Sequence, residues 1–316
     1  MKFLIIGLGN IGLRHIQGLS KLSDDNLEFY IFSRTNNFET KLKKKIDIFK
    51  KNYKFKNVKK LADLKDIIFD LTIISTTATD RIKILLDLVN KVNTKYIMIE
   101  KPISQSEYEL QDLKKLKYKN IFVNFPRRYC NWHKKIKDKL NGNNINKIHR
   151  IEILGSKLGL ACNTCHFIDL VVFFTIKKPT KVLSNKLSNW YKSKRNNFYD
   201  VDGVLEVEFE DKISLKINSM EKKRNLEIKF YDNESNEILF IDYVKGEAKF
   251  LDGEIIKGEL KYQSESSHKM FRLIQKNDKD LCKLDDAIEP HELLIKEFIK
   301  HWNNKFKTNN QKIMIT

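Results

Sequence analysis

A glycine-rich turn directly after the first apolar run constrains this chain more than any other feature. The run Phe3–Ile6 is typical of a β-strand and a helical pattern follows, so the fingerprint G-x-G-x-x-G has its strand–turn–helix context at Gly7-Leu8-Gly9-Asn10-Ile11-Gly12. The first glycine permits a tight turn, the second lets a pyrophosphate approach the backbone, and the third allows close helix packing. The helix N-terminus favours negative charge. We expect a dinucleotide to contact Gly7, Gly9, Asn10, Ile11 and Gly12; a glycine turn without a ligand is the alternative.

The first 124 residues alternate short apolar runs with amphipathic stretches, which predicts a parallel sheet covered by helices. Strands are expected at Phe3–Ile6, Glu28–Phe32, Leu71–Ser75, Tyr96–Ile99 and Ile121–Phe125. Helices are expected near residues 11–22, 38–51, 79–91 and 106–117, and the last opens with Ser106 and Glu109 at capping-box spacing. We therefore predict an α/β, doubly wound Rossmann domain over residues 1–124.

The pattern changes in residues 125–316, where strands follow one another without intervening helices. They are expected at Val204–Phe209, Ile213–Ile217, Leu226–Tyr231 and Ile238–Tyr243, and apolar and charged residues alternate in several, as in a sheet with one solvated face. Helices are expected near 130–141, 162–175 and, after Pro290, 289–304; Asp252-Gly253 predicts a hairpin turn. We predict an α+β substrate and oligomerisation domain with a large, mainly antiparallel open sheet, whose C-terminal segment can pack back on the first domain.

The end of the second predicted strand bears on the choice of cofactor. An acid about 20 residues beyond the glycine loop accepts hydrogen bonds from the adenosine ribose of NAD. This chain has Ser33 and Arg34 there, and a hydroxyl with a guanidinium suits a 2′-phosphate. We expect NADP(H), with NAD(H) as the alternative. The other interpretation of Arg34 is a surface charge in a basic chain.

Two further segments carry a family resemblance. The motif E-K-P occurs in Ile99-Glu100-Lys101-Pro102-Ile103, and an earlier strand leads into the loop Ile74-Ser75-Thr76-Thr77-Ala78-Thr79. With the glycine loop, these segments resemble the Gfo/Idh/MocA family of sugar dehydrogenases, clearly in the first half and through one helix in the second. The loop lacks the proline and histidine that are usual in that family. The resemblance implies cofactor contacts at Ser75, Thr76, Glu100 and Lys101. It also implies that Lys101 contacts the reacting hydroxyl, whose oxygen an ammonium can polarise.

The family's second signature is a helix with D-x-x-x-H and an acid three residues later. In this chain the corresponding stretch is Cys162-Asn163-Thr164-Cys165-His166-Phe167-Ile168-Asp169. The resemblance implies that His166 is a second acid/base, and that Cys162, Asn163 and Asp169 contact substrate. Cys162 departs from the pattern because a thiol does not replace a carboxylate, so either Lys101 and His166 suffice or the substrate differs. A histidine with a purely structural role is the alternative.

The same stretch spells C-x-x-C-H, the attachment motif of c-type haem. Haem attachment requires export, and the chain shows no leader, so haem, a redox pair and zinc are all disfavoured. We expect no metal. Arg127 and Arg128 follow the last predicted Rossmann strand, where the family often has a substrate-binding arginine; a solvated basic turn is the alternative.

Charge and cysteine content limit the remaining function classes. The formal net charge is +19, but lysine is spread along the whole chain, as in a lysine-rich proteome. The densest runs, at residues 41–51 and 134–139, are interpreted as solvated helix faces. Nucleic-acid binding is therefore a minor alternative, and no membrane span is expected. Four cysteines and no signal peptide predict a cytoplasmic protein.

These observations predict an NAD(P)-dependent oxidoreductase that acts on a secondary hydroxyl or ketone of a sugar or sugar derivative, with the substrate bound between the domains. Family analogy suggests a nucleotide-activated or acidic amino sugar in surface-glycan biosynthesis. The family also implies a homo-dimer or homo-tetramer. The other hypotheses are a nicotinamide-binding sensor or scaffold without turnover, suggested by Cys162, and a basic nucleic-acid-binding protein.

Overall fold

The computed structural model describes residues 1–23, 26–34, 53–143, 147–220 and 225–316. This part of the chain divides into two compact units. Unit 1 comprises Met1–Ser104, Asp112–Tyr129 and Lys261–Asp286; unit 2 comprises Gln105–Gln111, Cys130–Leu260 and Ala287–Thr316. The domain boundary between residues 124 and 125 stays a prediction.

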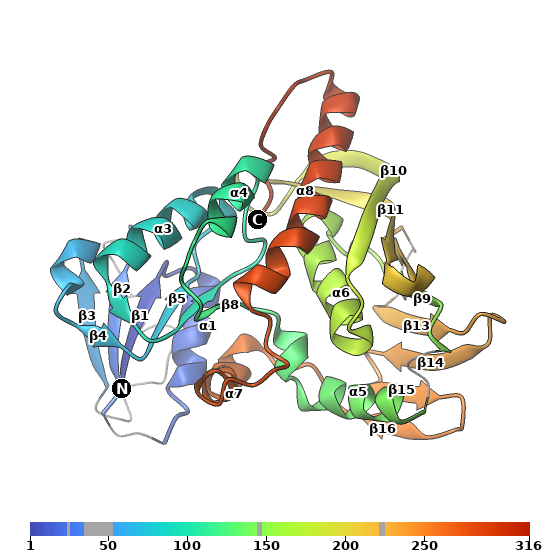
Figure 1. Ribbon diagram of the computed structural model, residues 1–316, viewed down its shortest axis with the longest axis horizontal. Helices are drawn as coiled ribbons and strands as arrows, with labels where there is room; N and C mark the ends of the chain where they lie inside the picture. The colour runs from blue at the N-terminus through green and yellow to red at the C-terminus, as the bar shows by residue number, and fades with distance from the viewer. Residues whose placement is uncertain (24–25, 35–52, 144–146, 221–224) are drawn as a thin grey trace. The chain divides into compact units, whose positions relative to one another are not determined.

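Unit 1 is built on a six-stranded parallel sheet in the order β3-β2-β1-β5-β7-β8 (Figure 1). Its strands are β1 (Lys2–Ile6), β2 (Glu28–Phe32), β3 (Lys54–Val58), β5 (Leu71–Ile74), β7 (Ile97–Ile99) and β8 (Ile121–Val123). A two-stranded parallel sheet pairs β4 (Ile68–Phe69) with β6 (Asn93–Thr94). The strand order reverses at β1, so a ligand site is expected outside the carboxyl ends of β1 and β5.

The helices of unit 1 include one from far along the chain. α1 (Asn10–Leu19) and α3 (Arg81–Lys91) follow β1 and β5, whereas α7 (Gln263–Gln275) returns from the C-terminal half. α7 packs on α1 so closely that a Cβ at Gly18 would lie 2.6 Å from the Cβ of Ser267. Phe271 packs edge-on against Phe3, with 5.2 Å between the ring centroids. α7 thus completes the core of the parallel sheet.

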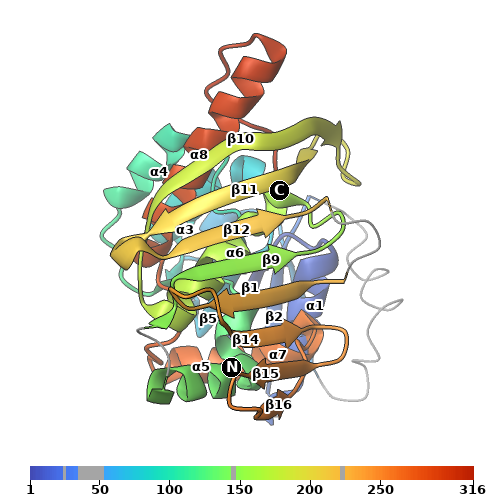
Figure 2. The same ribbon diagram turned by 90° about the vertical axis from the view of Figure 1, so that its right-hand side faces the viewer.

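Unit 2 is built on an eight-stranded mixed sheet in the order β10-β11-β12-β9-β13-β14-β15-β16, shown side by side in Figure 2. Only the pair β12 and β9 is parallel. The strands are β9 (Arg150–Leu154), β10 (Pro179–Lys192), β11 (Tyr199–Phe209), β12 (Ser214–Asn218), β13 (Glu227–Tyr231), β14 (Glu237–Asp242), β15 (Glu247–Phe250) and β16 (Ile255–Lys257). The fold class predicted from the sequence is confirmed in both units.

One face of this sheet packs on α6 (Leu160–Thr175), and charged side chains pair across strands on the other, as Lys186 does with Glu206. Apolar residues point to α6 and alternate with polar ones, which is the pattern that predicted one solvated face. The other helices are α4 (Glu107–Lys114), α5 (Asn131–Asn143) and α8 (Leu284–Phe306); short 3₁₀ turns lie at Leu61–Leu64, Ala78–Asp80, Pro126–Tyr129 and Glu210–Lys212.

The structure differs from the predicted elements in several places. The predicted start of the last helix, residue 289, was wrong, because α8 begins at Leu284. Pro290 lies inside the helix, although a proline leaves one helical hydrogen bond unmade. β3, β9, β10, β15, β16 and α7 were not predicted. The expected helix at 38–51 lies outside the described residues. The hairpin at Asp252-Gly253 is confirmed, with Gly253 at φ +85° between β15 and β16.

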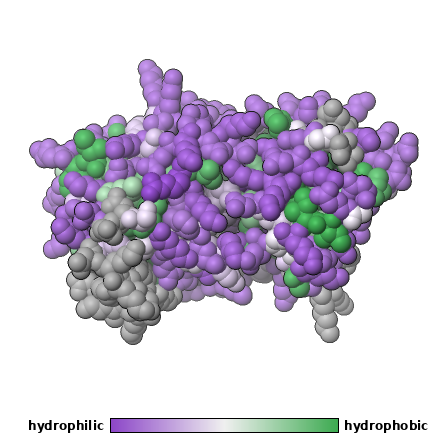
Figure 3. Space-filling model, turned by 90° about the horizontal axis from the view of Figure 1, so that it is seen from below, coloured by the Kyte–Doolittle hydropathy of each residue, from purple (hydrophilic) through white to green (hydrophobic). Residues whose placement is uncertain are grey.

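The lysines of α5 are partly used within the protein. Lys139 pairs with Asp252 and Glu254, and the Lys137 ammonium lies 4.3 Å from the centre of the Phe173 ring. The sequence predicted a solvated helix face here, but these two side chains have contacts within the protein. Figure 3 shows a face covered mainly by hydrophilic residues, with apolar residues in small groups. None of the described helices is long and apolar enough to cross a membrane.

Candidate functional site

Two glycines of the loop after β1 are required by the packing of unit 1 itself. Gly7 has φ +94°, and a Cβ there would lie 2.9 Å from the backbone nitrogen of Thr76. A Cβ at Gly12 would lie 2.2 Å from the carbonyl oxygen of Gly7. The turn and the first turn of α1 therefore exclude side chains at both positions.

Gly9 differs from its two neighbours in the motif. It is the N-cap residue of α1, and a Cβ there would have no heavy atom within 4 Å. As a glycine, this N-cap residue has no side chain with which to cap the helix. A glycine that packing does not require, at a helix N-terminus that its own N-cap residue leaves open, suits a ligand that approaches the backbone and carries negative charge. The loop thus fits the pyrophosphate of a dinucleotide at Gly9, Asn10 and Ile11.

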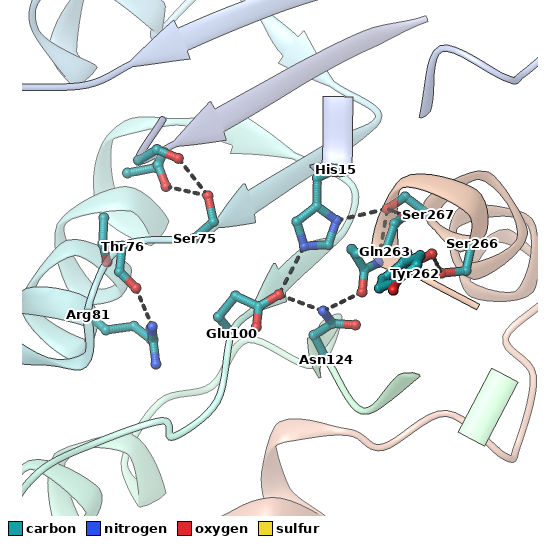
Figure 4. A network of polar contacts seen from close by, with 12 residues as sticks. His15, Ser75, Thr76, Arg81, Glu100, Asn124, Tyr262, Gln263, Ser266 and Ser267 are labelled. Carbon is teal, nitrogen blue, oxygen red and sulfur yellow. Dashed lines mark hydrogen bonds and ion pairs between the residues drawn. The ribbon is translucent and has the colours of Figure 1, made fainter. Parts of the chain in front are cut away.

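The loop after β5 lies against the glycine loop. The Ser75 hydroxyl donates to the Gly7 carbonyl at 2.7 Å, and the Thr76 hydroxyl is buried without a hydrogen-bond partner in the described structure. Thr76 also accepts a hydrogen bond at its carbonyl from Arg81 (Figure 4). The structure therefore brings Ser75 and Thr76, two of the residues predicted to contact the cofactor, next to Gly7.

Arg81 was missed by sequence reasoning. Its side chain is buried at the start of α3, and its guanidinium donates to the carbonyls of Thr76 and Pro102. A planar guanidinium can serve two acceptors at once, which a lysine cannot do with the same geometry. Arg81 thus ties the loop after β5 to the E-K-P turn, whose Lys101–Pro102 peptide bond is cis.

Glu100 is the centre of a buried polar network in unit 1 (Figure 4). Its Oε1 lies 2.9 Å from Nε2 of His15, a fully buried side chain of α1. Nδ1 of His15 lies 3.0 Å from the Ser267 hydroxyl of α7, and that hydroxyl donates to the Gln263 carbonyl. The network therefore joins the helix after the glycine loop, the E-K-P turn and α7.

Asn124, at the end of β8, extends the network. Its amide donates to Glu100 and to the side-chain oxygen of Gln263, and it accepts from the Tyr129 hydroxyl at 2.7 Å. Burial alone would raise the pKa of the Glu100 carboxyl. The hydrogen bond and charge of His15, the Asn124 amide and the charge of Arg81 instead lower this pKa below its ordinary value. Glu100 is thus held as a carboxylate, and this fixes the backbone beside half-buried Lys101.

At the end of β2, Arg34 pairs with an acid that sequence reasoning also missed. Its Nη2 lies 2.6 Å from Oδ2 of Asp80, the N-cap residue of α3. Ser33 is half-buried beside it. The charge of Arg34 is therefore balanced by a neighbouring loop.

The residues of the second signature all lie on α6, within unit 2. Cys162, Asn163 and His166 are half-buried, whereas Asp169 is buried; the Asn163 amide donates to the Leu158 carbonyl at 2.7 Å. His166 and Asp169 are three residues apart, so they share a face of the helix. Gly159, the N-cap residue of α6, has φ +67°, and Asp200 of β11 accepts from the Ala161 nitrogen at 2.9 Å.

The remaining predicted residues have mainly internal contacts. Arg127 and Arg128 are buried in the turn after β8, so this is not the solvated basic turn considered above. Arg128 donates to the Asp280 carbonyl at 3.1 Å. Cys162 and Cys165 form no disulfide within the described part of the chain, and Cys165 donates to the Cys162 carbonyl. The described residues contain no group of three metal-ligating side chains.

A parallel sheet with this strand order, a glycine turn and an uncapped helix start define unit 1 as a dinucleotide-binding Rossmann unit. Residues 1–123 match the model of a family described as "Oxidoreductase family, NAD-binding Rossmann fold", the Gfo/Idh/MocA family. The chain therefore matches the Gfo/Idh/MocA oxidoreductases over its first 123 residues, and the resemblance seen in the motifs of this part is confirmed. No curated protein matches the chain in sequence.

Solved structures share the fold over nearly the whole chain. UDP-N-acetylglucosamine 3-dehydrogenase GnnA from Acidithiobacillus ferrooxidans has a TM-score of 0.69 at 10% identity, over 94% of this chain and 96% of its own. Scyllo-inositol dehydrogenase from Lactobacillus casei, with bound NAD(H) and scyllo-inositol, has a TM-score of 0.66 at 15% identity, over 95% of this chain and 97% of its own. A Gfo/Idh/MocA family oxidoreductase from Vibrio cholerae has a TM-score of 0.67 at 13% identity, over 98% of this chain and 100% of its own. At these identities the similarity shows a common fold.

Proposed function

We propose that this protein is a nicotinamide-dependent oxidoreductase that interconverts a secondary hydroxyl and a ketone on a sugar or sugar derivative. The observation that carries the proposal is the glycine loop, where Gly7 and Gly12 are packed tightly and Gly9 is open at an uncapped helix start. The buried Glu100 network supports it, because it holds the residue before Lys101 in place.

The chain's own residues would handle the proton of this reaction. A bound nicotinamide would accept the hydride from the carbinol carbon, or return it to the ketone. Oxidation also releases the hydroxyl proton, which Lys101 would accept as the neutral amine, with His166 as a second acceptor or as a donor that orients the oxygen. In reduction the same groups would return that proton.

The remaining residues would bind cofactor and substrate. Pyrophosphate would contact Gly7, Gly9, Asn10, Ile11 and Gly12, with Ser33, Arg34, Ser75, Thr76 and Glu100 nearer the nucleosides. Substrate would contact Arg127, Arg128, Cys162, Asn163 and Asp169. The two arginines favour an anionic substrate, such as a nucleotide-activated or acidic amino sugar in glycan biosynthesis. GnnA, which acts on UDP-N-acetylglucosamine by its name, supports that class.

The first test is titration of the protein with NADH, NADPH, NAD⁺ and NADP⁺, followed by nicotinamide fluorescence. Gly9→Ala serves as the binding-site variant because a methyl group there meets no protein atom. We expect binding by the wild type and its loss in Gly9→Ala, with an unchanged unfolding midpoint. Absence of binding by any of the four cofactors would overturn the proposal.

Turnover is then measured with a panel that includes UDP-N-acetylglucosamine, UDP-glucuronic acid and scyllo-inositol, by nicotinamide absorbance. Lys101→Met is expected to abolish turnover and His166→Asn to lower it, while both variants retain cofactor binding. Binding of cofactor without turnover on the whole panel would instead support a sensor or scaffold. The cytoplasmic location and the homo-dimer or homo-tetramer stay predictions.

A further inference from the structure

The Arg34–Asp80 ion pair reaches across the strand that carries the glycine loop. Arg34 follows β2 and Asp80 follows β5, and these two strands flank β1 in the sheet. The backbone nitrogen of Gly7 donates to the Phe32 carbonyl at 2.9 Å on one side, and Ser75 donates to the Gly7 carbonyl on the other. Oδ2 of Asp80 therefore lies 2.6 Å from Nη2 of Arg34, at the edge formed by the carboxyl ends of the strands, where the adenosine half of a dinucleotide is expected.

The usual acid for the adenosine ribose is sought on the second strand itself. Here Ser33 and Arg34 occupy the end of that strand, and the acid comes from another loop 46 residues later in the chain. Such an acid has no fixed sequence distance from the glycine loop, so spacing alone does not reveal it. The pairing also changes the electrostatic expectation, because the guanidinium that would attract a 2′-phosphate already has a carboxylate partner.

We propose that Asp80 selects NADH over NADPH, as the carboxylate that serves the adenosine ribose in place of an acid on the second strand. The inference rests on the proposed nicotinamide site and sharpens it. A carboxylate accepts hydrogen bonds from ribose hydroxyls, whereas its charge repels a 2′-phosphate. This proposal is the opposite of the preference for NADP(H) that Ser33 and Arg34 predicted.

The position of the pair makes Asp80 suitable for substitution. The side chains of Arg34 and Asp80 are 87% and 38% exposed, and exposed ion pairs add little to folding stability. Asp87 on the same helix provides a matched control, because it forms a similar exposed pair with Lys91 at 2.6 Å and its side chain is 43% exposed. Asp80→Asn and Asp87→Asn therefore remove the same charge from neighbouring places.

The experiment measures the dissociation constants of NADH and NADPH for the wild type, Asp80→Asn and Asp87→Asn. We expect the wild type to bind NADH more tightly than NADPH. Asp80→Asn should shift the ratio of the two constants toward NADPH by about tenfold, from the lost repulsion of the 2′-phosphate. Asp87→Asn should leave the ratio unchanged.

Arg34→Gln provides a second test. In Asp80→Asn the Arg34 guanidinium can pair with the 2′-phosphate, so we expect that adding Arg34→Gln to this variant weakens NADPH binding. A wild type that prefers NADPH, or a ratio that Asp80→Asn does not move, overturns the inference while the nicotinamide site stands. Binding of neither cofactor by the wild type overturns the proposed function and the inference together.

Discussion

α1 and α6 both begin at a glycine and both carry a histidine, yet they use these residues in opposite ways. At the start of α1, Gly9 faces open space, and His15 is buried against Glu100 and Ser267. At the start of α6, a Cβ on Gly159 would lie 2.7 Å from Oδ2 of Asp200, while His166 is half-buried. The first helix thus leaves its N-terminus open and buries its histidine in a polar network. The second has its N-terminus bonded to Asp200 and leaves its histidine half-buried.

The largest effect is expected at the two histidines. His15→Leu leaves the buried Glu100 carboxylate without its main partner and should lower the free energy of unfolding by about 3 kcal/mol. His166→Leu should change it by less than about 1 kcal/mol, because His166 is only half-buried, whereas His15 is fully buried. Urea unfolding of both variants measures the difference, and equal losses would show that His166 is structural too.

The open start of α1 predicts a loss of binding without a loss of stability. Gly9→Ala should weaken nicotinamide binding about 100-fold, or about 2.7 kcal/mol, because the methyl group occupies the space of the pyrophosphate. Its unfolding midpoint should match that of the wild type. Fluorescence titration and thermal unfolding give the two values. Unchanged affinity would mean that the start of α1 binds no dinucleotide.

Gly159→Ala should show the reverse. Its left-handed backbone and the contact with Asp200 predict a loss of about 2 kcal/mol in folding stability. Nicotinamide affinity should stay that of the wild type, because the residue lies in unit 2. Asp200→Ala is the matched test of the helix cap and should cost about 1 kcal/mol. A drop in cofactor affinity in either variant would contradict the separation of roles.

The smallest effect concerns acid stability. The folded-state pKa of Glu100 is below its ordinary value of 4.5, so its contribution is complete above that pH and is lost as the pH falls through the lowered pKa. The free energy of unfolding of the wild type should therefore fall more steeply below about pH 4.5 than that of Glu100→Gln. Urea titrations at several acidic pH values measure both slopes, and parallel curves would contradict the assigned pKa direction.

Local patterns determined the part of this protein that depends on neighbouring residues. The glycine loop, the E-K-P turn and the alternation of strands and helices predicted the Rossmann half, because each motif is a strand end with its adjoining turn. Charge alternation likewise predicted the one-sided sheet of unit 2. The sequence did not predict the edge strand β3 and the bulged strand β10, because their patterns of exposed and buried residues are irregular.

Tertiary structure alone decided which side chains meet. His15 is 85 residues from Glu100 and 252 from Ser267, and Asp80 is 46 from Arg34. Histidine, glutamate and arginine occur throughout the chain, so sequence offers no reason to pair these particular ones. For Glu100 burial supplies the reason, because a charged group inside a protein is tolerated only where folding brings it a partner. Arg34 and Asp80 are exposed and meet because the fold brings the segments after β2 and β5 together. The sequence thus determined where a dinucleotide would bind, and the fold decided which charges surround it.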